Sequence, residues 1–434
     1  MAEPRGLLIA APASGSGKTF LTLALLRALR AAGVKVASAK AGPDYIDPRF
    51  HEAATGAPCP NLDPWAMAPA QLRALAAQSG GGADLMVIEG VMGLFDGAES
   101  GGGSSADLAA LLGLPVVLVI DARRQAQSVA ALVSGFAGFR ADCNVAGIIL
   151  NRVSSPRHRA ILEAALAPLQ IPVLGAVGED PSLNIPSRHL GLVQAGEHED
   201  LEQFLSEAAR IAAAGIDLER FAALAAPLPM PASAPALAPL GSRIAIASDA
   251  AFSFAYPHLL AGWRHAGAEL APFSPLAGEA PDPAADAIFL PGGYPELHAG
   301  RLAASGRFLA DLREAAARGV LVYGECGGFM VLGRGLIDAE GGRHAMAGLL
   351  PVETDFSRRS LHLGYRRLRH ASPLPWAPAL RGHEFHYSSL ARQGQGEALF
   401  EVADSAGRDL GAAGLRLGSA MGSYIHVIAP EAAP

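Results

Sequence analysis

Apolar and polar positions divide the first half of the chain into short apolar runs that alternate with longer stretches of helical periodicity. We predict strands at 6–11, 35–39, 85–89, 115–121, 145–150 and 172–177. We predict helices at 19–32, 105–113, 126–138 and 157–168. This alternation is typical of an α/β fold with a doubly wound, mostly parallel sheet that carries helices on both faces. Such a sheet binds its ligands at the carboxyl ends of the strands.

The second half repeats this rhythm after a proline-rich break. Residues 227–240 hold five prolines among small residues, so this stretch cannot continue a helix or a central strand. We therefore predict two domains, 1–226 and 241–434, joined by this linker. The second domain is predicted to contain the following elements: strands at 243–248, 287–290 and 320–323, helices near 256–267 and 305–318, and β-ribbons that end in a last strand near 420–428.

The composition is that of a globular protein of 434 residues, of which 50% are apolar and 17% charged. A net charge of −7 argues against a broad nucleic-acid-binding surface. Cys59, Cys143 and Cys326 are too few for a disulfide framework or a four-cysteine zinc site. No apolar run approaches the roughly 18 residues of a membrane span. We therefore expect a cytoplasmic protein without a nucleic-acid or membrane partner, and a homodimer is among the assemblies we consider.

A phosphate-binding loop is predicted between the first strand and the first helix. Residues 12–19 match the pattern GxxxxGK[ST], except that Pro12 replaces the first glycine. Small residues allow successive backbone N–H groups to face phosphate oxygens at a helix N-terminus. Lys18 is predicted to reach the β- and γ-phosphates of ATP, and Thr19 to bind Mg²⁺. The loop positions assigned to ATP binding with them are Ser14, Gly15, Ser16 and Gly17.

Further polar residues follow other strands at the same predicted edge of the sheet. Glu89 ends the strand 85–89, where a nucleotide-bound metal is usually held, although a strand-end carboxylate is also often only solvated. Lys40 is assigned to ATP binding. Asp44 and Asp47 follow it and could hold a metal or position an incoming acid, with simple turn chemistry as the alternative. Asn151 is predicted to pair with a purine edge or to serve as a turn residue.

The second domain carries a cysteine on a predicted nucleophile elbow. Cys326 follows a strand, is flanked by glycines and precedes a helical run, and the helix N-terminus is expected to lower the pKa of its thiol. Cys59 and Cys143 are interpreted as packing residues. His426 is the candidate base, with His383 and His386 as alternatives. The candidate oxyanion donors are the backbone N–H groups of Gly292, Gly293 and Gly327.

Together these motifs resemble the cobyrinic or hydrogenobyrinic acid a,c-diamide synthases over essentially the whole chain. The segments that carry the resemblance are 40–48, 61–63, 103–108, 291–296 and 382–388. It implies a class I glutamine amidotransferase domain joined to an ATP-dependent synthetase domain related to dethiobiotin synthetase. ATP would activate the a- and c-acetate carboxylates of a corrin-ring precursor, and ammonia from glutamine would form the amides.

The resemblance also implies roles for single residues. Cys326 would be the nucleophile and His426 its base, and Asp44, Asp47 and Glu89 would be acidic residues of the synthetase site. The candidates for contact with the polycarboxylate substrate are Tyr45, Ser105, Arg188, His189, Arg358 and Arg359. The last two belong to the arginine-rich stretch 357–370, for which a domain interface is the alternative.

The chain departs from the expected pattern at two positions. The usual class I triad has a Glu two residues after the His, but Ile428 stands there, so His426 must be oriented by another group. Ser187 stands where a Glu is expected in the motif 186–192, which puts an acid role at that position in doubt.

Other readings of the same motifs are a diamide synthase for nickel-sirohydrochlorin, a cobyric acid synthase, and a regulatory phosphate-loop ATPase whose second domain only binds a partner. The thiol on an elbow argues against the last, because a binding module does not need one. An arginine-rich, lysine-poor composition favours hydrogenobyrinic over cobyrinic acid as the substrate.

Overall fold

A computed structural model gives the fold as two compact units, Met1–Ala234 and Pro235–Pro434. The residues that the structure describes are 4–179, 187–188, 191–192, 194–197, 200–230 and 236–431. The start of the predicted linker belongs to the first unit, because Ala226–Pro227 (β10) pairs with the first strand. Residues 231–235 of that linker lie outside the described residues.

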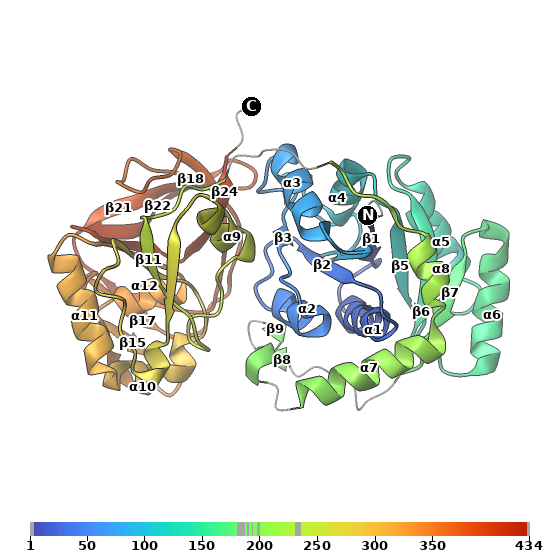
Figure 1. Cartoon of the computed structure of the whole chain (residues 1–434), viewed down its shortest axis with the longest axis horizontal. Helices are drawn as coiled ribbons and strands as arrows, with labels where there is room; N and C mark the ends of the chain where they lie inside the picture. Colours follow the sequence, from blue (N-terminus) through green and yellow to red (C-terminus); the bar gives the residue numbers. More distant parts are fainter. Residues whose placement is uncertain are drawn as a thin grey trace. The chain divides into compact units, whose positions relative to one another are not determined.

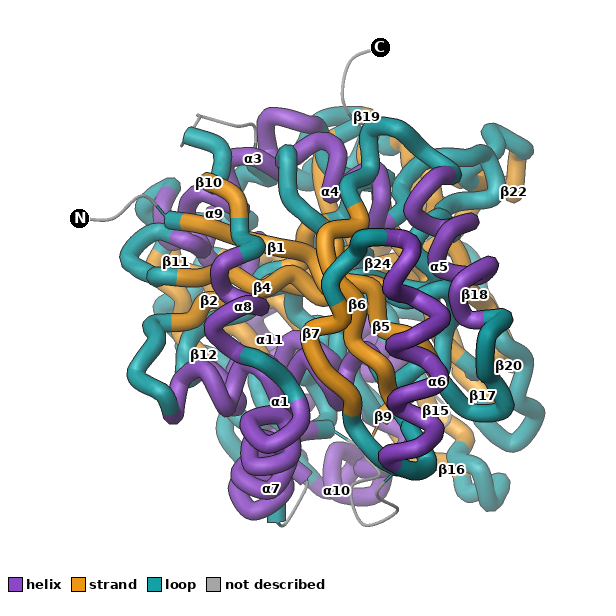
Figure 2. The backbone as a smooth tube through the Cα atoms, turned by 90° about the vertical axis from the view of Figure 1, so that its right-hand side faces the viewer, coloured by secondary structure: helices purple, strands orange, loops and turns teal. Residues whose placement is uncertain are grey.

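The first unit is built on a sheet whose strands run in the order β3-β2-β4-β1-β5-β6-β7 (Figures 1 and 2). All neighbours along this path are parallel, and β10 pairs antiparallel with β1. The strands are Arg5–Ala10 (β1), Val36–Ala41 (β2), Asn61–Leu62 (β3), Leu85–Glu89 (β4), Val116–Asp121 (β5), Val145–Asn151 (β6) and Val173–Ala176 (β7). Their apolar side chains are almost all buried, as expected for a sheet covered on both faces.

Helices cover both faces of this sheet, which confirms the predicted doubly wound α/β fold. Helix α1 packs against α2 and α7 on one face, and α3 and α4 lie on the other (Figure 1). The helices are Lys18–Ala31 (α1), Asp47–Thr55 (α2), Pro69–Gly80 (α3), Ser105–Leu112 (α4), Val129–Gly138 (α5), Pro156–Leu166 (α6), Leu201–Gly215 (α7) and Leu218–Ala223 (α8). A short ribbon, Ser187–Arg188 (β8) with Gly191–Leu192 (β9), precedes α7.

The second unit contains a ten-stranded sheet that is parallel in one half and antiparallel in the other. Its order is β12-β11-β13-β14-β23-β22-β21-β18-β19-β24, and the first five strands are parallel. These are Glu269–Phe273 (β12), Arg243–Ala247 (β11), Ala287–Leu290 (β13), Leu321–Glu325 (β14) and Ala420–Ser423 (β23). The antiparallel half is formed by Asp409–Leu417 (β22), Glu397–Asp404 (β21), His362–Arg369 (β18), Ala379–His386 (β19) and Ile425–Pro430 (β24).

Four α-helices and a second, smaller sheet belong to the described part of this unit as well. The helices are Pro257–His265 (α9), Ala299–Ala304 (α10), Gly306–Ala317 (α11) and Gly327–Leu332 (α12). The small sheet has the order β16-β15-β17-β20 and consists of Arg343–Ala345, Gly335–Ile337, Val352–Asp355 and Ser389–Gln393. None of the described helices in either unit has the length and apolar character needed to cross a membrane.

The predicted single last strand at 420–428 is wrong, because the chain changes partners within it. Strand β23 pairs with β14, whereas β24 pairs with β19, and Tyr424 lies between them. The hydroxyl of Ser423 accepts a hydrogen bond from the backbone N–H of Ile425 at 3.1 Å, which stabilises the bend. A continuous apolar run does not reveal such a break, since both pieces are buried.

Candidate active sites

The predicted phosphate loop lies between β1 and α1 and has the backbone that its glycines allow. Gly15 and Gly17 have φ angles of +79° and +93°, a region that favours glycine. The side-chain amide of Asn151 donates to the carbonyl of Ser16 at 2.9 Å. A Cβ at Gly17 would lie only 2.2 Å from that amide nitrogen. Asn151, the last residue of β6, therefore supports the loop in this structure, and its contact with a purine stays a prediction.

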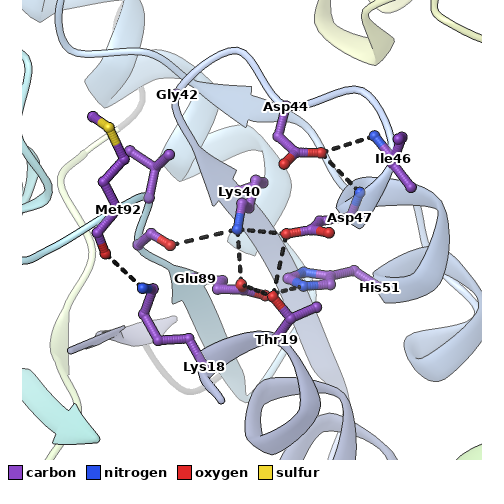
Figure 3. Close-up of polar contacts among 12 residues, drawn as sticks. Lys18, Thr19, Lys40, Gly42, Asp44, Ile46, Asp47, His51, Glu89 and Met92 are labelled. Carbon is purple, nitrogen blue, oxygen red and sulfur yellow. Dashed lines mark hydrogen bonds and ion pairs between the residues drawn. The ribbon is translucent and has the colours of Figure 1, made fainter. Parts of the chain in front are cut away.

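Lys18 is the first residue of α1, and its side chain extends to the segment that follows β4. Its ammonium group donates to the carbonyl of Met92 at 2.5 Å (Figure 3). Burial, together with the nearby positive charge of Lys40, lowers the pKa of Lys18 to about 8. Because anionic phosphates would oppose both effects, a nucleotide bound here would favour the charged form of Lys18.

A buried cluster of charges at the ends of β2 and β4 brings together four of the predicted residues (Figure 3). The Lys40 ammonium lies 2.7 Å from Glu89 Oε1 and 2.7 Å from Asp47 Oδ2. The Thr19 hydroxyl donates to Glu89 Oε1 at 2.7 Å and to Asp47 Oδ2 at 3.3 Å. Burial disfavours the charges of this cluster, but the two carboxylates raise the pKa of Lys40 well above its ordinary value.

His51 belongs to this cluster, and the sequence analysis missed it. Its Nε2 lies 2.6 Å from Glu89 Oε2, and its Nδ1 lies 3.5 Å from the sulfur of Cys59. Lys40 and His51 together hold the pKa of Glu89 below its ordinary value despite complete burial. Asp47 and His51 are four residues apart on α2 and so face the same way. That spacing could have identified His51, but the Asp-Pro start of α2 resembled a turn.

Asp44 has a different position from Asp47. Its carboxylate accepts hydrogen bonds from the backbone N–H groups of Ile46 and Asp47, at 2.8 and 2.9 Å. Asn61 supports the same turn by donating to the carbonyls of Gly42 and Asp44. In this structure Asp44 shapes the turn into α2, as the turn interpretation expected, and any direct part in the reaction stays a prediction.

The oxygen atoms around Thr19 fit the ligand preference of Mg²⁺. One hydroxyl and two carboxylates lie within hydrogen-bonding distance of one another, and Mg²⁺ prefers oxygen ligands from few carboxylates together with phosphates. Lys40 lies against both carboxylates, so it limits how many of their oxygens face a metal. Thr19, Asp47 and Glu89 are the residues that could hold such an ion.

Glu89→Gln is predicted to lower ATP-dependent amide formation by about 10² to 10³-fold, because it removes one electrostatic group while keeping the shape of the strand end. Glutamine hydrolysis is expected to remain. The measurement is the rate of amide formation over a Mg²⁺ titration. Glu163→Gln is the control, because Glu163 lies half-buried on α6, where it pairs with Arg159. Unchanged rates and an unchanged Mg²⁺ dependence would make Glu89 a structural residue.

The cysteine elbow of the second unit is present. Cys326 has φ +46° and ψ −105°, between β14 and α12. A Cβ on Gly328 would lie 1.9 Å from the carbonyl oxygen of Leu290, so only glycine fits there. The backbone N–H of Cys326 donates to the carbonyl of Ser423 at 2.8 Å, which joins the elbow to β23. This strained turn presents the thiol at the carboxyl end of the parallel strands.

The expected lowering of the thiol pKa is not found. Burial and the carboxylate of Glu296 raise the pKa of Cys326, and the hydrogen bond from Gly327 only partly opposes them. Helix α12 has only six residues, so its dipole is too weak to offset the effect of complete burial on the pKa of the thiol. Burial also lowers the pKa of His426 to about 3, so both groups are neutral at rest.

Gly292 lies where the nucleophile and its candidate base meet. A Cβ on Gly292 would lie 2.4 Å from Cε1 of His426, 2.9 Å from its Nε2 and 3.1 Å from Cβ of Cys326. A Cβ on Gly327 would lie 3.0 Å from the backbone nitrogen of Gly293. The structure thus brings all three predicted oxyanion glycines to the elbow, and their oxyanion role stays a prediction.

Gly292→Ala is predicted to reduce glutamine-dependent amidation by about 10²-fold or more, because its methyl group would displace the imidazole of His426 and a misplacement of about 1 Å is enough for such a loss. Amidation with added ammonia should be retained. Both rates can be measured on the same preparation, with Gly306→Ala as the control, since no atom lies within 4 Å of a Cβ at Gly306. Retained glutamine use would contradict this placement of Gly292.

The two alternative bases have other surroundings. His386 stacks on Tyr424 with ring centroids 4.0 Å apart, and its ring nitrogens lie 2.9 Å from Glu384 Oε1 and 3.0 Å from the carbonyl of Ser388. His383 lies directly opposite His426 in the β19–β24 pair. The engagement of both its nitrogens argues against His386, and the choice of His426 over His383 stays a prediction.

The structure describes the side chains of four of the six predicted substrate residues, two in each unit. Tyr45 is buried in the loop between β2 and α2. The buried hydroxyl of Ser105 accepts a hydrogen bond from the backbone N–H of Val91 and donates one to its carbonyl. Arg358 and Arg359 are exposed before β18 in the second unit. All of His189 lies outside the described residues, and of the motif 186–192 the structure describes only the backbone of β8 and β9, so the side chain of Arg188 is not described.

Comparison with known proteins matches both units to family models. A CobQ/CobB/MinD/ParA nucleotide binding domain matches residues 7–193, and a CobB/CobQ-like glutamine amidotransferase domain matches 243–434. The chain is therefore a glutamine amidotransferase joined to a nucleotide-binding domain. Hydrogenobyrinate a,c-diamide synthase of Brucella anthropi is 60% identical over 98% of both chains. That of Rhizobium meliloti is 55% identical over 98% of this chain and 99% of its own. The chain belongs to the hydrogenobyrinate a,c-diamide synthase family.

Proposed function

We propose that this chain uses ATP and glutamine to amidate the a- and c-acetate carboxylates of hydrogenobyrinic acid in cobalamin biosynthesis. The observation that carries the proposal is its 52–60% identity, over 98–99% of its length, to proteins named for this reaction. Membership of this family leaves no support for a regulatory ATPase with a non-catalytic second domain. The phosphate loop and the cysteine elbow supply the two activities that the reaction needs.

In the first unit, the γ-phosphoryl group of ATP would pass to an oxygen of the substrate carboxylate, and ADP would leave. Lys18 and the loop N–H groups would hold the phosphates. Mg²⁺, held by Thr19 with Asp47 or Glu89, would neutralise phosphate charge. His51 and Lys40 would fix the orientation of Glu89, as their distances of 2.6 and 2.7 Å to its oxygens support.

In the second unit, the sulfur of Cys326 would attack the glutamine carboxamide after its proton passes to His426. His426 would give this proton to the carboxamide nitrogen, which would leave as ammonia, and water would then release glutamate from the thioester. Ammonia would then attack the acyl phosphate, and phosphate would leave as the amide forms. The backbone N–H groups at the elbow would stabilise the oxyanion, in support of which Gly292, Gly293 and Gly327 lie together.

The test is incubation of the protein with ATP, Mg²⁺ and glutamine together with hydrogenobyrinic acid, cobyrinic acid or nickel-sirohydrochlorin, each in turn. Mass spectrometry should show two amides on hydrogenobyrinic acid in preference to the other two. Preferred amidation of either metal-containing macrocycle would overturn the choice of substrate. The homodimer and the absence of nucleic-acid and membrane partners stay predictions.

A further inference from the structure

The third member of the class I triad has no counterpart on the histidine strand. Ile428 follows His426 by two residues on β24, its side chain is buried, and its carbonyl accepts a hydrogen bond from His258 at 3.0 Å. The imidazole of His426 is itself fully buried. A base in such a position needs a neighbouring group that fixes its ring and its tautomer.

A carboxylate from another strand occupies this neighbourhood. Glu325 is the last residue of β14, next to Cys326, and its Oε2 lies 3.7 Å from Nδ1 of His426. Its Oε1 accepts hydrogen bonds from the backbone N–H of Val427 at 3.1 Å and from the hydroxyl of Tyr323 at 3.0 Å. The side chain of Glu325 is only 2% exposed. One oxygen therefore anchors the carboxyl group to the histidine strand, and the other faces the imidazole.

The two edges of the imidazole thus face different partners. Nδ1 faces the carboxyl group of Glu325. Nε2 lies on the side of Gly292, where an added Cβ would be 2.9 Å from Nε2 of His426 and 3.1 Å from Cβ of Cys326. This is the arrangement in which a carboxylate holds a proton on Nδ1 and leaves Nε2 to take the proton of the nucleophile. A separation of 3.7 Å is longer than a hydrogen bond, and such contacts often tighten when substrate binds.

We propose that Glu325 is the positioning residue for His426 and replaces the missing triad carboxylate from the position directly before the nucleophile. This proposal rests on the proposed glutamine hydrolysis by Cys326. It also gives a reason for an acidic residue at the end of an otherwise apolar, buried strand.

The surroundings of Glu325 and His426 determine how glutamine hydrolysis should depend on pH. Burial raises the pKa of Glu325 to about 8, although its hydrogen bonds from Val427 and Tyr323 oppose this. Burial lowers the pKa of His426 to about 3, so the imidazole titrates far below the pH at which Glu325 ionises. The other titratable groups beside this pair are Tyr256, Tyr323, Cys326, His383, Glu384 and His386. An ionised Glu325 is therefore present above about pH 8 and lost as the pH falls.

The test is glutamine hydrolysis by the full-length chain with ATP and the macrocycle present. Glu325→Gln keeps the shape and an acceptor for Val427 but removes the carboxylate. Its kcat should fall by about 10² to 10⁴-fold, since the loss of a triad carboxylate selects the wrong tautomer. KM for glutamine and the rate with added ammonia should be unchanged. The wild-type kcat/KM should decrease below about pH 8, and this decrease should be absent in the variant.

Tyr323→Phe is the matched control, because it removes a hydrogen bond of Glu325 without removing the carboxylate. Its kcat should fall less than about tenfold, which corresponds to one neutral hydrogen bond. Glu325→Asp should lower kcat but keep the decrease of kcat/KM below about pH 8. This variant tests the proposal if Glu325→Gln does not fold. A wild-type kcat in Glu325→Gln, an equal loss in Tyr323→Phe, or a Glu325→Asp profile without that decrease would overturn the proposal. Wild-type protein that does not hydrolyse glutamine would instead contradict the proposed function.

Discussion

Cys326→Ala is expected to abolish glutamine-dependent amidation while leaving amidation with added ammonia close to the wild-type rate. The thiol is required only to form the glutamyl thioester, and removal of a nucleophile costs at least about 10³-fold. The elbow itself should survive, because its conformation depends on Gly328 and on the hydrogen bond from the backbone of residue 326 to Ser423. Both rates can be followed by the mass of the macrocycle.

Cys143→Ala is the matched control, since Cys143 is also buried but lies in the first unit. It should keep both activities. A folded Cys326→Ala protein that loses the ammonia-dependent reaction as well would contradict the separation of the two chemistries. Full retention of glutamine use would contradict the assignment of the nucleophile.

Lys18→Ala is expected to stop amidation from both nitrogen sources, by about 10³-fold or more. Phosphoryl activation precedes the attack of ammonia from either source, and one positive charge on the transferred group contributes an effect of this size. The neutral variant would also lose the contact with Met92, so its melting temperature should be compared with that of the wild type. Product formation is measured with glutamine and with ammonium separately.

The chain offers a close control in Lys35→Ala, because lysine occurs only at positions 18, 35 and 40 and Lys35 is exposed. Lys35→Ala should retain both reactions. Amidation by Lys18→Ala with added ammonium at the wild-type rate would show that the loop does not activate the carboxylate. The Cys326 and Lys18 variants together therefore distinguish the source of nitrogen from the activation of the acid.

The sequence by itself determined the features that depend on consecutive residues. The strands around the phosphate loop, the loop itself and the elbow at Cys326 follow from local patterns, because glycine positions and apolar periodicity fix backbone conformation over a few residues. The predicted strands at 85–89 and 287–290 have the bounds of β4 and β13. The resemblance to the diamide synthases likewise rested on short segments.

Only the tertiary structure decided which side chains meet and how their charges behave. His51 on α2 reaches Glu89 on β4, and Glu325 on β14 faces His426 on β24, so each contact joins elements that are far apart in the chain and no local pattern predicts it. The raised pKa of the Cys326 thiol likewise comes from burial and from Glu296, whereas the sequence showed only the following helix. Desolvation and long-range contacts are properties of the packed chain, which is why they reversed the predicted shift of the thiol pKa and placed a carboxylate beside the histidine.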